Sequence, residues 1–235
     1  MKVLGIDTAT PLGVVGFIED ERAVLESRIS IRPGGGERLP ALIADLLKAL
    51  QWKPNDLDLI VAGIGPGSYT GIRVGLALAR SMAFALSRPL VGIPTQEAIA
   101  AIGDQGEGIT VVLADARRGE TYTTMTKYRP ESNILFGPGI LPVDEVIERL
   151  NDLNEPVLLL GDGTRIYREQ LATRLKIPVR WGNAEMDSPS GVILAQLGLK
   201  KWLNASKDEL DSIEPLYLRK VEAEVRLMER RKMTT

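Results

Sequence analysis

Two aspartates in the same local setting are the first candidates for chemistry in this chain. Asp7 closes an apolar strand predicted over residues 3–7, and Asp115 closes another over residues 109–115. Strand-end carboxylates of this kind can bind a hydrated magnesium ion, as in phosphotransfer enzymes. They can equally accept hydrogen bonds from the backbone of the following turn, which is a structural role. The spacing leaves both roles open.

A glycine-rich turn over residues 65–71 leads into a helix predicted from Thr70 to Ser87. A dinucleotide fingerprint needs glycine where Thr70 stands, a phosphate-binding P-loop needs Gly-Lys-Ser/Thr, and Ser68 lacks the spacing of a nucleophile elbow. Two interpretations remain: an anion site on free amides at the helix N-terminus, or a tight strand-to-helix turn. The residues of this candidate nucleotide or anion cleft are Asp7, Thr8, Gly65, Gly67, Ser68 and Asp115.

Composition removes several kinds of active site. The 235 residues include no histidine and no cysteine, which excludes a Ser-His-Asp triad, a His-ligated metal, a thiol nucleophile and disulfides. Acid–base catalysis by Lys, Asp, Glu or Tyr is still possible. The formal net charge of −2 argues against a broad nucleic-acid surface. Arg117, Arg118 and the basic residues within 219–232 are candidates for local RNA contact, although interleaved glutamates in that tail favour a solvated helix.

The N-terminus leads directly into a strand, without the pattern of a signal sequence. The cysteine-free composition suits a reducing compartment, and no run of residues is long and apolar enough for a membrane span. We therefore expect a cytoplasmic protein with no metal, no cofactor and no membrane contact.

Alternating strands and helices must position the two aspartates and the glycine turn. Apolar runs predict a hairpin over residues 3–18, strands at 57–62 and 90–93, and a second set that starts over at residue 109. This repetition predicts an α/β fold with a duplicated lobe. The predicted lobes are residues 1–105, joined by the C-terminal segment 214–235, and residues 106–213. Further predicted segments are a junction at 104–108, a loop at 130–139, helices at 143–150 and 190–203, and a linker at 208–213.

The helices predicted over residues 37–50 and 70–87 are unusually apolar. In the first, Leu39 opens a series of leucine and isoleucine at i+3, i+4, i+7, i+8 and i+11. In the second, Gly75, Ala79 and Ala83 form a strip of small residues that allows another helix to approach closely. These faces belong either to the chain's own core or to an interface with a partner chain.

Four segments of the sequence resemble the TsaB (YeaZ) family. They are Gly5-Ile-Asp-Thr-Ala-Thr10, Gly65-Pro-Gly-Ser-Tyr-Thr-Gly-Ile-Arg-Val-Gly75, Asp115-Ala-Arg-Arg-Gly-Glu-Thr-Tyr122 and Glu214-Pro-Leu-Tyr-Leu-Arg219, in the family's order. The resemblance implies a two-lobed actin/Hsp70/sugar-kinase-like (ASKHA) fold, with a mixed sheet flanked by helices in each lobe. It also implies a role in making threonylcarbamoyladenosine next to the anticodon of tRNA.

The resemblance further implies how the work is divided between subunits. In that system TsaD carries the transferase site, TsaE is an associated ATPase and TsaC makes the threonylcarbamoyl-adenylate donor, while TsaB is a required, non-catalytic partner. TsaD-like chains carry the metal motif H-x-E-G-H where this sequence reads Thr95-Gln-Glu-Ala-Ile99, so both imidazoles are missing. The glycine-rich residues 32–37 depart from relatives that often carry histidine there.

The family's pairing surface consists of the two helices of the first lobe, which would meet TsaD or a second copy of the chain. The interface residues expected here are Leu39, Leu42, Ile43, Leu46, Arg73, Gly75, Leu76, Ala79, Arg80 and Ala83. The small-residue strip then predicts that Ala79→Arg or Gly75→Leu abolishes pairing by steric overlap while leaving the fold mostly intact.

The sequence thus favours a non-catalytic subunit that pairs with TsaD and meets TsaE and tRNA within the same complex. The alternative is an ATP-dependent ASKHA-type phosphotransferase or ATPase, which would use Asp7, Asp115 and the glycine turn. A peptidase is a weaker alternative, because without His or Cys it would need a Ser-Lys or carboxylate mechanism that no pattern here identifies.

Overall fold

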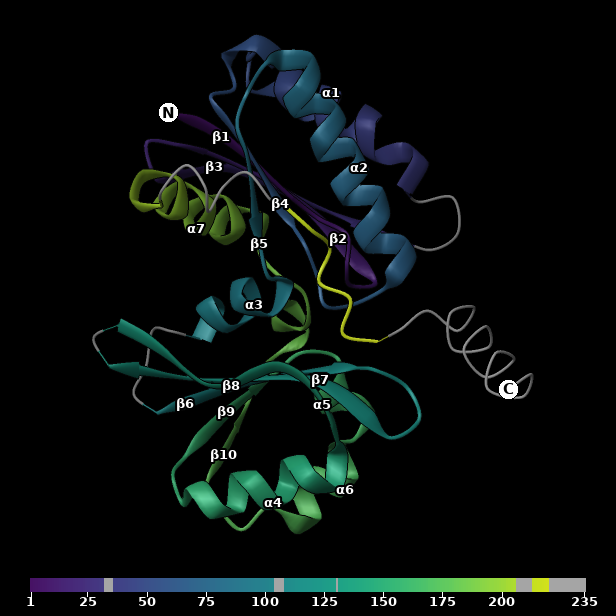
Figure 1. Ribbon diagram of the computed structural model, residues 1–235, viewed down its shortest axis with the longest axis vertical. Helices are drawn as coiled ribbons and strands as arrows, with labels where there is room; N and C mark the ends of the chain where they lie inside the picture. The colour runs from purple at the N-terminus through teal and green to yellow at the C-terminus, as the bar shows by residue number, and fades with distance from the viewer. Residues whose placement is uncertain (32–35, 104–107, 130, 206–212, 220–235) are drawn as a thin grey trace, which may run out of the picture.

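The chain forms two lobes, each built around a β-sheet. The computed structural model describes residues 1–31, 36–103, 108–129, 131–205 and 213–219, and Figure 1 shows one lobe above the other. Several predicted features lie wholly or mostly outside these residues, namely the glycine-rich loop at 32–35, the junction at 104–107, the linker at 208–212 and the charged tail from residue 220.

The first sheet has five strands in the order β3-β2-β1-β4-β5. These strands are β1 (Lys2–Asp7), β2 (Leu12–Glu19), β3 (Arg22–Ser30), β4 (Leu59–Gly63) and β5 (Leu90–Ile93). β2 runs antiparallel to its neighbours β1 and β3, and β4 and β5 run parallel to β1. The continuous burial of β1 and β4 fits their place in the middle of a sheet that is covered on both faces.

The second sheet repeats this topology with the order β8-β7-β6-β9-β10. Its strands are β6 (Ile109–Asp115), β7 (Glu120–Arg129), β8 (Glu131–Pro142), β9 (Val157–Leu160) and β10 (Val179–Trp181). The predicted duplication of an α/β lobe is therefore confirmed. The prediction of a loop at 130–139 is wrong, because β8 includes residues 131–139. Gly137 and Pro138 suggested a loop, but β8 is an edge strand, where proline is tolerated.

Helices cover both faces of the first sheet. α1 (Leu39–Ala49) and α2 (Tyr69–Leu86) pack on one face around a core that includes Phe17 and Ile60. α7 (Gly191–Asn204) packs on the opposite face, against β1, β2, β4 and β5 (Figure 1).

The position of α7 differs from the predicted boundary, which placed residues 106–213 in the second lobe. Glu26 on β3 accepts a hydrogen bond from the Val192 amide at 3.1 Å, and the Ser190 hydroxyl caps the helix by accepting from the Ile193 amide at 3.2 Å. The chain therefore returns to the first lobe before residue 191. The described part of the C-terminal segment also contacts the first lobe, since the Leu216 amide donates to the Ile64 carbonyl at 2.8 Å.

The second lobe has its own helices. α4 (Val143–Leu153), α5 (Gly163–Ile166) and α6 (Arg168–Arg174) follow β8 and β9, and the main core of the lobe forms between the sheet and residues such as Val146, Ile147 and Leu171. A further helix that the sequence did not predict, α3 (Thr95–Gly103), lies between the two sheets (Figure 1). None of the helices in the described ranges is long and apolar enough to cross a membrane.

Candidate functional site

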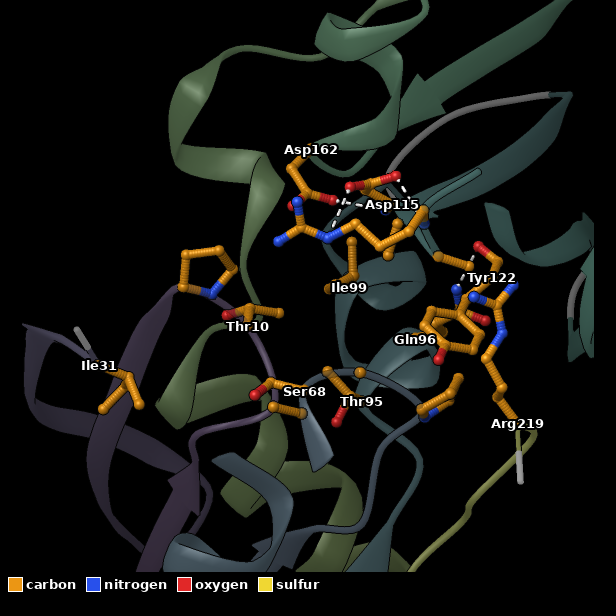
Figure 2. Close-up of a pocket in the computed structure, with 17 residues that line it drawn as sticks. Thr10, Ile31, Ser68, Thr95, Gln96, Ile99, Asp115, Tyr122, Asp162 and Arg219 are labelled. Atoms are coloured by element: carbon orange, nitrogen blue, oxygen red, sulfur yellow. Dashed lines mark hydrogen bonds and ion pairs between the residues drawn. The ribbon is translucent and has the colours of Figure 1, made fainter. Parts of the chain in front are cut away.

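A cleft of about 420 Å³ separates the two lobes. Figure 2 shows Asp115 and Asp162 on one side of it and Ser68 and Thr95 on the other. Its lining combines polar side chains of both lobes with a few apolar ones: Ala9, Thr10, Pro11, Ile31, Pro66, Gly67, Ser68, Thr95, Gln96, Ile99, Ala114, Asp115, Ala116, Arg117, Tyr122, Asp162 and Arg219.

Asp7 is buried beneath the cleft and is not among the residues that line it. Its side chain is 1% exposed. One carboxylate oxygen accepts a hydrogen bond from the Thr95 hydroxyl at 2.7 Å, and the other accepts from the Ala9 amide at 2.7 Å. Burial without a cationic partner raises the pKa of Asp7 to about 6. Of the two roles left open by the sequence, these contacts fit the structural one, because the carboxylate ties the end of β1 to the start of α3.

Asp115 lies in a different environment from Asp7. It lines the cleft, accepts from the Arg117 amide at 2.9 Å and from the Tyr167 hydroxyl at 3.2 Å, and forms an ion pair with the Arg117 guanidinium at 3.5 Å. Asp162 accepts from the Asp115 amide at 3.0 Å, and burial raises the pKa of Asp162. Asp115 therefore also organises the turn that follows its strand. Across the ranges that the structure describes, no group of three or more His, Cys, Asp or Glu side chains is arranged to bind a metal ion.

The glycine-rich turn is held closely against the β1–β2 connection. The Ser68 amide donates to the Ala9 carbonyl at 2.8 Å, and the Ser68 hydroxyl caps α2 by accepting from the Gly71 amide at 3.2 Å. A Cβ on Gly71 would lie 2.0 Å from the Thr8 carbonyl oxygen, so a side chain cannot fit. Thr8 in turn donates its hydroxyl to the Gly71 carbonyl at 2.6 Å. These contacts favour the tight strand-to-helix turn over a free anion site, although Gly67 and Ser68 still reach the cleft.

Most of the predicted interface residues are buried in the chain's own first lobe. Leu39, Ile43, Leu76, Ala79 and Ala83 are 0–8% exposed and belong to the core under α1 and α2. Gly75 is also buried, and a Cβ there would lie 2.3 Å from the Thr8 hydroxyl oxygen. These six residues are therefore covered by the first lobe itself. The expectation that Gly75→Leu or Ala79→Arg would leave the fold intact stays a prediction, and the burial of both positions argues against it.

The other four predicted interface residues do reach the surface. Leu42 and Leu46 are partly buried, whereas Arg73 and Arg80 are exposed. Both arginines bind the C-terminal segment: Arg73 donates to the Tyr217 hydroxyl at 3.1 Å, and Arg80 donates to the Ile213 carbonyl.

The sequence interpretation missed Phe84, which is the most exposed large apolar side chain of the described residues, at 89%. It lies on α2 with the exposed Ala77 and Ser81, at i+7 and i+3 from them. Because the helix is apolar nearly all round, its pattern alone did not distinguish the buried face from the outer one. A signal was available in the sequence. Phe84 directly follows Ala83 of the small-residue strip, and consecutive residues of a helix do not share a face, so Phe84 points away from the strip.

The other missed residues are at the cleft. Thr95 and Gln96 begin α3, are 1% and 0% exposed, and form hydrogen bonds to different lobes. The available signal was three polar residues directly after Pro94, followed by the apolar run Ala98–Ala100, which is typical of a helix start.

Comparisons with known proteins match nearly the whole chain. A family model described as TsaD, tRNA N6-adenosine threonylcarbamoyltransferase, matches residues 36–227. The chain is 29% identical to the tRNA threonylcarbamoyladenosine biosynthesis protein TsaB of Bacillus subtilis (99% of this chain, 100% of that protein), and 28% identical to TsaB of Escherichia coli (93% and 95%). The solved structure of YeaZ from Pseudomonas aeruginosa superposes with a TM-score of 0.76 at 26% identity, covering 92% of this chain and 99% of that one. This likeness and the repeated sheet order confirm the predicted two-lobed ASKHA-type α/β fold.

Proposed function

Because the chain belongs to the TsaB (YeaZ) family, we propose that it takes part in the biosynthesis of threonylcarbamoyladenosine in tRNA. The observation that supports this role is similarity over both lobes to relatives whose names state it. A match confined to one lobe would support only a shared fold.

Within that process we propose a non-catalytic subunit that pairs with TsaD, with TsaE as a further member and tRNA reached through the complex. Two positions support the division of labour. Thr95 and Ile99 stand where TsaD-like chains carry imidazole ligands; the Thr95 hydroxyl is bound to Asp7, and Ile99 is packed in the core. Neither side chain is available to bind a metal ion.

The pairing surface that we propose is the outer face of α1 and α2, formed by Leu42, Leu46, Ala77, Ser81 and Phe84 and called here the α1–α2 face. The single observation that carries it is the 89% exposure of Phe84. Covering a phenylalanine side chain contributes roughly 1.5–3 kcal/mol, and an exposed apolar patch of this kind is typical of an interaction site. Because the TsaD family model spans α1 and α2, a TsaD chain is expected to present equivalent helices. A second copy of this chain would present the same face.

The alternative, an ATP-dependent phosphotransferase, has less support. It needs Asp7 and Asp115 to share a metal ion or phosphate, but Asp7 is buried beneath the cleft and Asp115 is held by Arg117 and Tyr167. Tight magnesium-ATP binding by the isolated chain, lost in Asp7→Ala, would favour it.

Reconstitution tests the proposal directly. Purified chain, TsaD, TsaE, tRNA and a threonylcarbamoyl-adenylate donor are combined, and modified adenosine in the tRNA is measured by mass spectrometry. We expect modification only when this chain is present, together with co-elution of the chain and TsaD on size exclusion with light scattering. Full modification without the chain would overturn the role, and an exclusively homodimeric chain would overturn the pairing with TsaD.

A further inference from the structure

α3 connects the two lobes through opposite faces of one short helix. Ala98 packs in the first-lobe core with Val3, Val91 and Leu194. Its neighbours Ile99 and Ala100 pack in a second-lobe cluster with residues of β6 and β9. Figure 1 shows the helix lying between the upper and the lower sheet. Apolar packing alone is non-directional, however, and would let the lobes slide past one another.

Hydrogen bonds from the first turn of α3, which are directional, fix the helix to the first lobe. The Thr95 hydroxyl donates to Asp7 on β1 at 2.7 Å and accepts from the Gly65 amide at 3.1 Å. The Thr95 amide donates to the Gly65 carbonyl at 2.8 Å. Thr95 is therefore fixed to β1 and to the glycine-rich turn.

Gln96 is bound in the same way to the second lobe. Its amide nitrogen donates to the Tyr122 carbonyl on β7 at 2.6 Å, and its amide oxygen accepts from the Thr124 hydroxyl, also on β7, at 2.6 Å. Gln96 is 0% exposed and Thr124 is 3% exposed. Both ends of the buried amide are thus satisfied by the other lobe, and moving the lobe would take these partners from the Gln96 amide and from the buried Thr124 hydroxyl.

Other polar links between the lobes, among the residues that the structure describes, are weaker. One is exposed: Arg28 on β3 donates to the Glu185 carbonyl at 3.0 Å. Arg219 pairs with Glu120, but both side chains are about one third exposed, so solvent screens this pair. Thr10 and Ser188 share a hydroxyl contact at 3.2 Å. The buried amide of Gln96 orients the lobes more strongly than these contacts.

We propose that the hydrogen bonds of Thr95 and Gln96 hold the two lobes in one orientation and the cleft at one width. Because of these hydrogen bonds, the two lobes move as one rigid body. They do not undergo the hinge motion that opens and closes a cleft around a ligand in other two-lobed proteins. This rigidity is a property of the isolated chain and does not depend on the proposed function.

The absence of cysteine allows a direct measurement of lobe orientation. Cysteines are introduced by Asn55→Cys in the first lobe and Asp152→Cys in the second, both at exposed positions, and each carries a spin label. Pulsed electron resonance then gives the distribution of distances between the labels. We expect one narrow distribution with Gln96 in place, and a broader distribution or a second maximum with Gln96→Met, which keeps the side-chain length and removes both hydrogen bonds.

Gln196→Met is the matched control. The Gln196 amide donates to the Glu21 carbonyl at 2.7 Å within the first lobe, so its loss should leave the distribution unchanged. Circular dichroism verifies that each variant is folded. A folded Gln96→Met chain with the unchanged narrow distribution would overturn the proposal. If Gln96→Met does not fold, Thr124→Val removes only one of the two bonds, and an unchanged distribution in that folded variant would overturn it equally.

Discussion

The Thr95 hydroxyl donates a hydrogen bond to the carboxylate of Asp7 at 2.7 Å, although the two residues are 88 positions apart in the chain. The contact joins the end of β1 to the first turn of α3, and no cationic side chain of the described residues contributes to the pKa of Asp7. It explains why a strand-end aspartate that looks like a metal ligand in the sequence serves the architecture of the first lobe.

Stability should fall between pH 4 and pH 6 because of Asp7. Its pKa rises from the usual 3.8 to about 6 on folding, so the folded state holds the proton more tightly than the unfolded state. The resulting stabilisation is full below pH 3.8 and is lost as the pH rises through about 6. In Asp7→Asn the side chain is neutral at every pH. Relative to that variant, the free energy of unfolding of the unchanged protein should drop by about 2 kcal/mol from pH 4 to pH 7.

Urea denaturation of both proteins across this pH range measures the difference. Parallel pH dependences for the unchanged protein and Asp7→Asn would mean that Asp7 does not titrate in this window.

Gly75→Leu should destabilise the first lobe itself. The new Cβ would lie 2.3 Å from the Thr8 hydroxyl oxygen, so Thr8 or α2 must shift to accept it. Overpacking of this kind costs about 1–3 kcal/mol or more. Ala77→Leu, at an exposed position on the same helix, is the control and should change stability by no more than about 0.5 kcal/mol. The measurement is the urea midpoint, and a Gly75→Leu chain as stable as Ala77→Leu would contradict the burial of this face.

Phe84→Ala should weaken pairing without weakening the fold. The ring makes few contacts within the chain, so its removal should shift stability by no more than about 0.5 kcal/mol. At the centre of an interface, an aromatic anchor of this kind is worth about 2 kcal/mol or more, a loss of at least about tenfold in affinity. Isothermal titration calorimetry against TsaD measures that loss.

Leu203→Ala serves as the comparison for Phe84→Ala, because Leu203 is 61% exposed on α7, far from the α1–α2 face. Affinity for TsaD should not change in that variant. Equal affinities for both variants and the unchanged chain would place the pairing surface elsewhere.

The contacts of Arg73 should hold the C-terminal segment in place. Arg73 donates to the Tyr217 hydroxyl at 3.1 Å and its guanidinium stacks over the Tyr69 ring at 4.1 Å, next to the Tyr69–Tyr217 ring pair. In Arg73→Ala the Leu216 amide, which donates to the Ile64 carbonyl, should therefore exchange its hydrogen faster. Hydrogen exchange followed by mass spectrometry detects this change. Lys48→Ala on the exposed surface of α1 should leave the exchange rate as it is.

Much of the fold was predictable from local sequence. The apolar runs that became β1, β4, β6 and β9 are buried on both faces, and such runs identify strands without knowledge of their neighbours. The two copies of an apolar strand ending in aspartate correctly predicted the duplicated lobe. The edge strand β8 was missed because glycine and proline have the same local signature in a loop and in an edge strand.

The tertiary structure alone decided which lobe receives α7, which face of α2 is covered and what Asp7 contacts. Each of these depends on residues far apart in the chain, such as Glu26 with Val192 or Asp7 with Thr95, and no periodicity within one element encodes them. By itself, the sequence determined most of the strands and helices apart from α3 and β8, the absence of histidine and cysteine chemistry, and the family, because these follow from residue type and local spacing. The close approach of α2 to Thr8 then settled that the small-residue strip of α2 packs inward and that Phe84 faces the solvent.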